Sequence, residues 1–191
     1  MLNVFQYHVT PKELSNIDKV INYYISNPDD TGSSDDDVWH QPPLDILFAI
    51  SGRVPSMESK IKTEARIAMS YITHALKKDP AWEYPNGRWP EAELNIMKDP
   101  LFAYDYAKDV IKGRWPEAES IIMKKPSAAF MYAMYIINGR WSEAEPYIME
   151  DLFMALQYAK NVIKGRWHEA EEYIKNDWAV WDDYKQEFGV K

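Results

Sequence analysis

The chain has 191 residues, of which 46% are hydrophobic and 14% aromatic, a supply of apolar side chains that argues against global disorder. Its net charge of −8 disfavours passive binding to nucleic-acid phosphates. The absence of cysteine excludes disulfides, thiolate metal sites and thiol nucleophiles. The sequence shows neither a leader pattern nor an apolar run of membrane-spanning length, so we expect a soluble, cytoplasmic protein without membrane contact.

Residues 1–51 predict an irregular helical N-terminal cap. After an extended arm, a capping box with proline at the first helical position starts a helix over residues 11–26. The stretch 27–40 is rich in aspartate but lacks the ligand spacing of a calcium-binding EF-hand, so we interpret it as an exposed acidic loop. A further helix is predicted over residues 43–51, and it runs into a glycine.

A seven-residue phrase, Gly-Arg-Trp-Pro-Glu-Ala-Glu, recurs every 26 residues, with serine or histidine replacing proline in the last two copies. The copies begin at Gly87, Gly113, Gly139 and Gly165. A degraded copy begins at Gly52, and the extra nine residues before the next copy predict an insertion over 78–86. A fixed period of this size predicts stacked supersecondary units. The predicted organisation is a cap (1–51), a degenerate repeat with an insertion (52–86), helical repeats (87–176) and a C-terminal capping helix (177–191).

The sequence of each full 26-residue repeat predicts two helices. In the first copy, one helix covers residues 90–98 and ends at Asp99, because the residue before a proline is pushed out of the α region. The second covers about 101–112, with apolar residues at i, i+3, i+4, i+7 and i+8. We expect the next glycine to be the left-handed residue that ends this helix. The predicted fold class is therefore all-α: a short right-handed αα-solenoid of two-helix repeats with an irregular helical cap.

The repeated tryptophans are interpreted as core. Each lies just before a helix start, in one stripe with an alanine and an isoleucine, which is typical of packing rather than of a ligand-stacking ladder. These residues are Trp89, Trp115, Trp141 and Trp167. In the capping helix, the predicted apolar stripe is Trp178, Trp181, Tyr184 and Phe188.

The phrase arginines form a second periodic set: Arg88, Arg114, Arg140 and Arg166. One cation per repeat is a pattern that could contact the phosphates of a ligand. Each arginine also follows a predicted helix C-terminus and lies near two glutamates of its own phrase, which favours structural ion pairs. We interpret the ladder as structural and keep ligand contact as an alternative.

The outer face of the second helix differs between copies. Polar residues of the neighbouring copies are replaced in the middle copy by Met131, Met134 and Tyr135, next to Phe130. Exposed apolar surface rich in Met and Tyr is typical of interfaces. We predict that these four residues bind a protein partner or a second copy of the chain. The alternative is that the N-terminal arm or the insertion covers them.

No catalytic, cofactor or metal site is predicted. The histidines His8, His40, His74 and His168 are scattered. The repeated glutamates lie two residues apart on one helix, too close for an acid–base couple. The stretch from Asp35 to His40 is kept as an alternative location for an enzyme site.

The phrase, followed by Tyr-Ala-x-x-Val-Ile-Lys before the next glycine, resembles a helical repeat of bacteriophage-encoded proteins that have no shared activity. The resemblance covers roughly residues 87–176, with a degraded copy over 43–77. It implies a phage protein in the host cytoplasm. We expect a non-enzymatic protein-binding module that inhibits a host (defence) protein or serves as a virion component. The alternatives are a nucleic-acid or nucleotide binder that uses the arginine ladder, and a small enzyme with its site in the cap.

Overall fold

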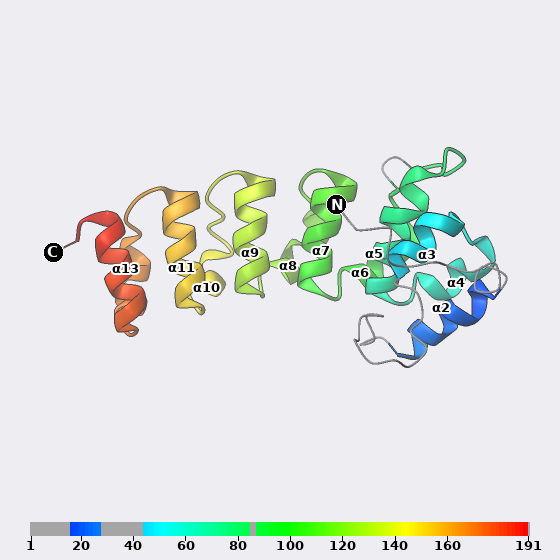
Figure 1. The fold of residues 1–191 in the computed structure, drawn as a ribbon. Helices are drawn as coiled ribbons and strands as arrows, with labels where there is room; N and C mark the ends of the chain where they lie inside the picture. Colours follow the sequence, from blue (N-terminus) through cyan, green and yellow to red (C-terminus); the bar gives the residue numbers. More distant parts are fainter. Residues whose placement is uncertain (1–15, 28–43, 85–86, 191) are drawn as a thin grey trace. The chain divides into compact units, whose positions relative to one another are not determined.

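The computed structural model describes residues 16–27, 44–84 and 87–190, which form helices and turns without a strand (Figure 1). The predicted all-α class with helix pairs every 26 residues is confirmed over these residues. The chain forms two compact units, Met1–Lys98 and Asp99–Lys191. The N-terminal arm, the start of the first predicted helix and most of the acidic loop, including His40, lie outside the described residues.

The first unit contains the cap helices, the degraded repeat and the first helix of the first full repeat. Its elements are α2 (Ile17–Ser26), α3 (Leu44–Ser51), η2 (Pro55–Met57), α4 (Glu58–Ile61), α5 (Ala65–His74), η3 (Leu76–Lys78) and α6 (Pro90–Ile96). The ring of Tyr71 on α5 lies 4.9 Å from Phe48 and 5.7 Å from Trp89, centroid to centroid. These aromatic side chains join α3, α5 and the start of α6 in one core.

The predicted insertion packs within the first unit. Trp82 donates a hydrogen bond from its indole Nε1 to the carbonyl of Arg88 (2.8 Å), and its ring stands edge-on to Trp89 at 6.1 Å. The guanidinium of Arg53 lies 4.8 Å from the Trp82 ring centroid. The chain then turns at Gly87, whose φ of +78° and close approach to the backbone of Lys77 (3.0 Å from an added Cβ) both require glycine.

The second unit contains α7, the second helix of the first full repeat, and the three helix pairs that follow it. Its first helices are α8 (Pro116–Ile122), α10 (Glu145–Ile148) and α12 (His168–Ile174). Its second helices are α7 (Pro100–Tyr106), α9 (Pro126–Tyr132), α11 (Leu152–Tyr158) and α13 (Trp178–Phe188). The first three of these continue into single wide turns, η5 (Ala107–Ile111), η6 (Ala133–Ile137) and η7 (Ala159–Ile163). Within this unit the second helices lie side by side, each in contact with the next (Figure 1).

Local sequence explains where these helices begin. Proline occupies the first turn of α7, α8 and α9, where its missing N–H costs no hydrogen bond. The carboxylate of Asp99 caps α7 by accepting from the N–H groups of Leu101 and Phe102. In the third copy a proline comes four residues later, at Pro146, and cannot donate the hydrogen bond that would extend α10 toward its N-terminus. The first helix of that copy is correspondingly the short one.

The expectation that the phrase glycine takes the left-handed conformation is wrong for three copies. The left-handed residue is the one before it: Lys112 (φ 59°), Asn138 (φ 56°) and Lys164 (φ 58°). The three second helices α7, α9 and α11 continue into a π turn; after α7, the N–H of Lys112 donates to the carbonyl of Ala107, five residues back. Gly113 then donates to the same carbonyl at 3.1 Å. The left-handed residue that ends the helix is therefore the one before the phrase, whereas a standard glycine cap would place it on the phrase glycine.

The predicted core is confirmed in the repeats and corrected in the C-terminal capping helix, α13. The phrase tryptophans are buried, between 1% and 3% exposed, together with the alanine and isoleucine of each stripe. In α13, Tyr184 is fully buried, whereas Trp178 is 83% exposed and does not belong to the apolar stripe. Trp178 is the first residue of its helix, at the repeat position held by Pro100 and Pro126, which are themselves only half-buried.

Candidate functional site

The phrase arginines are ion-paired with the second glutamate of their own phrase. Arg140 donates from Nε and Nη2 to the two carboxylate oxygens of Glu145, both at 2.8 Å, a bidentate geometry that positions the planar guanidinium. The same pairing occurs at Arg53–Glu58, Arg88–Glu93, Arg114–Glu119 and Arg166–Glu171. The four phrase arginines are between 41% and 56% exposed, whereas their glutamates are between 10% and 13% exposed.

A tyrosine from the second helix of the repeat completes the groups of Glu58, Glu119, Glu145 and Glu171. The hydroxyl of Tyr158 donates to Glu145 Oε1 (3.1 Å) and accepts the backbone N–H of Trp141 (2.7 Å). Its ring lies 5.0 Å from Trp167 of the following repeat. One tyrosine therefore closes its own hairpin through the hydroxyl and contacts the next hairpin through the ring. The same hydroxyl contacts are made by Tyr71, Tyr132 and Tyr184.

The charges in these groups are balanced internally. The hydrogen bond from Arg114 lowers the pKa of Glu119, and burial raises the pKa of Tyr132 to about 12. At neutral pH the Arg114–Glu119–Tyr132 group therefore holds a charged arginine, a charged glutamate and a neutral tyrosine. The predicted structural role of the arginines accounts for their geometry, while ligand contact by their exposed edges stays a prediction.

The outward side chains of the second helices form a surface that we call the second-helix face. It comprises Asp105, Lys108 and Asp109; Met131, Met134 and Tyr135; Gln157, Lys160 and Asn161; and Asp183, Gln186 and Glu187. Of the predicted binding residues, Tyr135 is 57% exposed, and Phe130, Met131 and Met134 are half-buried beside it. The ammonium of Lys108 lies 5.7 Å from the centroids of both Tyr104 and Tyr135, so this part of the face combines an aromatic surface with a cation.

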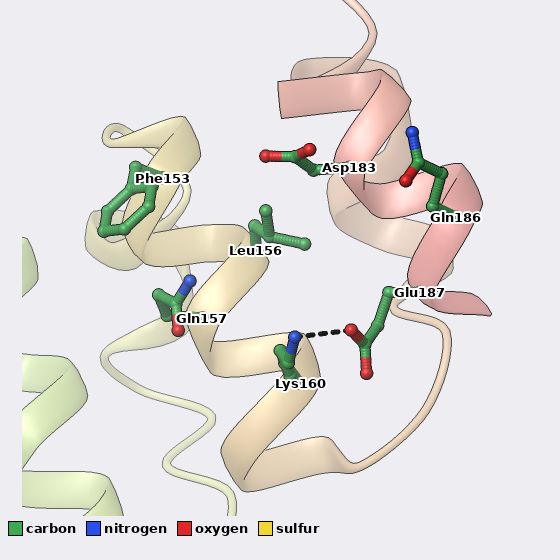
Figure 2. A pocket seen from close by; sticks show the side chains of 7 residues that line it. All are labelled: Phe153, Leu156, Gln157, Lys160, Asp183, Gln186 and Glu187. Atoms are coloured by element: carbon green, nitrogen blue, oxygen red, sulfur yellow. Dashed lines mark ion pairs between the residues drawn. The ribbon is translucent and has the colours of Figure 1, made fainter. Parts of the chain in front are cut away.

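A groove between α11 and α13 was not predicted from the sequence. It has a volume of about 420 Å³ and is lined by Phe153, Leu156, Gln157, Lys160, Asp183, Gln186 and Glu187 (Figure 2). Lys160 on η7 pairs with Glu187 on α13 at 2.5 Å. Phe153 is 55% exposed. A signal for it exists in the sequence, because the equivalent positions of other copies hold Leu101, Ser127 and Ala179, and only this copy has an aromatic residue there.

Within the described ranges, no three His, Asp or Glu side chains are grouped as metal ligands. The nearest arrangement to a catalytic cluster is Ser70–Asp45–His74, in which Asp45 accepts from the serine hydroxyl (2.6 Å) and lies 3.6 Å from His74 Nε2. The carboxylate stands between the serine and the histidine, so the imidazole is not placed to activate the hydroxyl. This cluster joins α3 to α5.

None of the helices in the described part of the chain is long and apolar enough to cross a membrane. Comparisons of the chain with protein-family models, with curated proteins and with solved structures find no match.

Proposed function

We propose that this chain is a non-enzymatic protein-binding module whose contact surface is the second-helix face of the second unit. The observation that carries the proposal is that Tyr135 is 57% exposed and lies beside half-buried Met131 and Met134. The equivalent positions of the neighbouring repeats hold polar residues. A tyrosine next to flexible methionines offers a large apolar contact area and a hydrogen-bonding hydroxyl, the combination that interface hot spots favour.

The alternative in which the insertion covers this surface has little support. The insertion residue Trp82 is engaged by Trp89, by Arg53 and by the carbonyl of Arg88, all within the first unit. The N-terminal arm lies outside the described residues, so its role as a cover stays a prediction. On the resemblance of the repeat phrase to phage proteins, the partner would be a host protein whose action is blocked, or a virion protein.

The test is capture of the partner from infected and uninfected host cells, identification by mass spectrometry, and titration of the purified partner against the full chain. Met134→Asp places a charge in the contact area and should raise the dissociation constant of the complex by about tenfold or more. The matched control is Tyr173→Ala, since Tyr173 is similarly exposed (52%) but lies on α12, a first helix. Equal affinity of wild type and Met134→Asp would refute the assignment of this face.

Nucleic-acid binding through the arginine ladder has no observation in its favour beyond the half-exposure of the guanidinium groups. It would require binding to RNA or DNA that falls steeply with salt. It would also have to be lost when two ladder arginines are changed to alanine.

A further inference from the structure

The groove between α11 and α13 carries an unbalanced negative charge. Lys160 and Glu187 neutralise each other, whereas no lysine or arginine of the described chain lies within ion-pair distance of Asp183. Figure 2 shows the Asp183 carboxylate directed from α13 toward Leu156 on α11. One lysine against two carboxylates leaves one net negative charge at the groove, which a cation from outside the chain would balance.

The same groove offers apolar surface at one end, where Phe153 is 55% exposed; Leu156 on α11 borders the groove but is itself buried, only 4% exposed. The volume of about 420 Å³ lies in the lower part of the roughly 300–1,000 Å³ range of ligand-binding pockets. A lysine or arginine side chain matches this arrangement, because its apolar stem can lie against Phe153 while its charged end reaches Asp183.

A second carboxylate lies at the other end of the second-helix face: Asp105 on α7 has no lysine or arginine of the described chain within ion-pair distance. Burial raises the pKa of Asp105 on α7, and the neighbouring Asp109 raises it further, while Lys108 offsets this only in part. Lys108 itself faces the rings of Tyr104 and Tyr135. The face therefore has an apolar centre on α9 with carboxylates beyond it on α7 and on α13.

We propose that the partner presents a basic–apolar–basic segment to this face. A lysine or arginine enters the α11–α13 groove against Asp183, apolar side chains cover Met134 and Tyr135, and a second basic residue approaches Asp105. Adjacent packed helices lie about 8–10 Å apart, so three steps from α7 to α13 span roughly 24–30 Å. An extended segment of about eight or nine residues covers this distance. The inference rests on the proposed function, because it names the chemistry of the partner at the same face.

The test uses the full chain as bait for a random library of displayed peptides of about 12 residues, long enough to cross the face. Selected peptides should carry Lys or Arg on both sides of aliphatic or aromatic residues. A synthetic copy of the best peptide should bind Asp183→Asn about tenfold more weakly than wild type, the effect of losing one charge-assisted hydrogen bond. Glu150→Gln is the matched control, since it removes the same charge from an exposed residue away from the face. Asp183→Lys should shift the selection toward acidic residues.

Peptides without basic residues, or equal affinities of Asp183→Asn and Glu150→Gln, would overturn the proposal. Apolar peptides that Met134→Asp rejects and Asp183→Asn still binds would overturn it while leaving protein binding at this face in place. Failure to select any peptide would count against both. If Asp183→Asn instead abolishes association of the chain with itself, measured by sedimentation, the occupant is a second copy and the basic segment is refuted. Circular dichroism confirms that each variant keeps its helices.

Discussion

Removing a single hydroxyl from the repeated tyrosine tests whether the Arg–Glu–Tyr groups stabilise the fold. In Tyr158→Phe the ring keeps its contact with Trp167, and Glu145 keeps both hydrogen bonds from Arg140. What is lost is the acceptor for the backbone N–H of Trp141, a buried hydrogen bond of 2.7 Å, together with the hydroxyl's own hydrogen bond to Glu145 Oε1 (3.1 Å). A buried donor left without a partner costs about 1–3 kcal/mol, so the free energy of unfolding should fall by about 2 kcal/mol.

The assay is urea unfolding of the full chain, followed by tryptophan fluorescence and by far-ultraviolet circular dichroism. The midpoint should fall with little change in the denaturant slope, because the surface exposed on unfolding is almost the same. For a unit of this size, about 2 kcal/mol corresponds to a decrease in Tm of roughly 10 °C.

Tyr147→Phe is the matched control in the same repeat. Tyr147 is half-buried on α10, and its hydroxyl makes no hydrogen bond to another described residue, so this variant should stay within about 0.5 kcal/mol of wild type. If the two variants lose equal stability, the hydroxyl network does not stabilise the fold, and burial of the ring accounts for the presence of tyrosine.

The remaining predictions concern backbone conformation and pH. Gly87→Ala should destabilise by about 1–3 kcal/mol, because the new Cβ meets the backbone of Lys77 at a left-handed φ. Gly139→Ala should change stability by less than about 1 kcal/mol, since a Cβ there meets nothing within 4 Å; equal urea midpoints for the two variants would contradict this. Alkaline titration followed by tyrosinate absorbance should show Tyr132 ionising near pH 12. In the unfolded chain this tyrosine ionises near pH 10, so the stability that its hydroxyl contributes should be lost as the pH rises from 10 to about 12. Tyrosinate absorbance that has already reached its final value by pH 11 would contradict the raised pKa of Tyr132. Burial lowers the pKa of His74, so as the pH falls below 6.5 the imidazole is protonated more readily in the unfolded state than in the folded state. Stability should therefore fall from pH 7.5 to 5.5 more in wild type than in His74→Gln, and parallel urea midpoints would disprove the effect.

The repeat architecture could be predicted because its signal is periodic. Trp115, Ala118 and Ile122 recur at one spacing in every copy, and residues that recur at helical offsets usually share a buried face. The choice of ion-pair partner could not be predicted. Both Glu117 and Glu119 lie close to Arg114 in sequence, and only the path of the chain into α8 determines that Glu119 meets the guanidinium.

The errors have physical causes. The π turn that follows α7, α9 and α11 adds one residue to the last turn, so that after α7 the left-handed residue is Lys112 rather than Gly113, and no residue type in this stretch indicates a π turn. Trp178 was assigned to the core because it fits a helical stripe, although it is the first residue of α13, and the first residues of the other second helices are only half-buried. The groove beside Phe153 depends on the spacing of two helices, which a single sequence does not contain.

The joint between consecutive hairpins is the same wherever it occurs in the second unit: a tyrosine ring about 5 Å from the next tryptophan, at Tyr106–Trp115, Tyr132–Trp141 and Tyr158–Trp167. The series stops at α13, where Tyr184 meets Trp181 (5.4 Å) and Phe188 (4.6 Å) of its own helix instead. Each 26-residue repeat therefore contributes its tryptophan to the contact with the preceding hairpin and its tyrosine to the contact with the following one. Duplication or deletion of a whole 26-residue repeat within the second unit would therefore preserve these tyrosine–tryptophan contacts, so the array could change its length without a new contact of this kind.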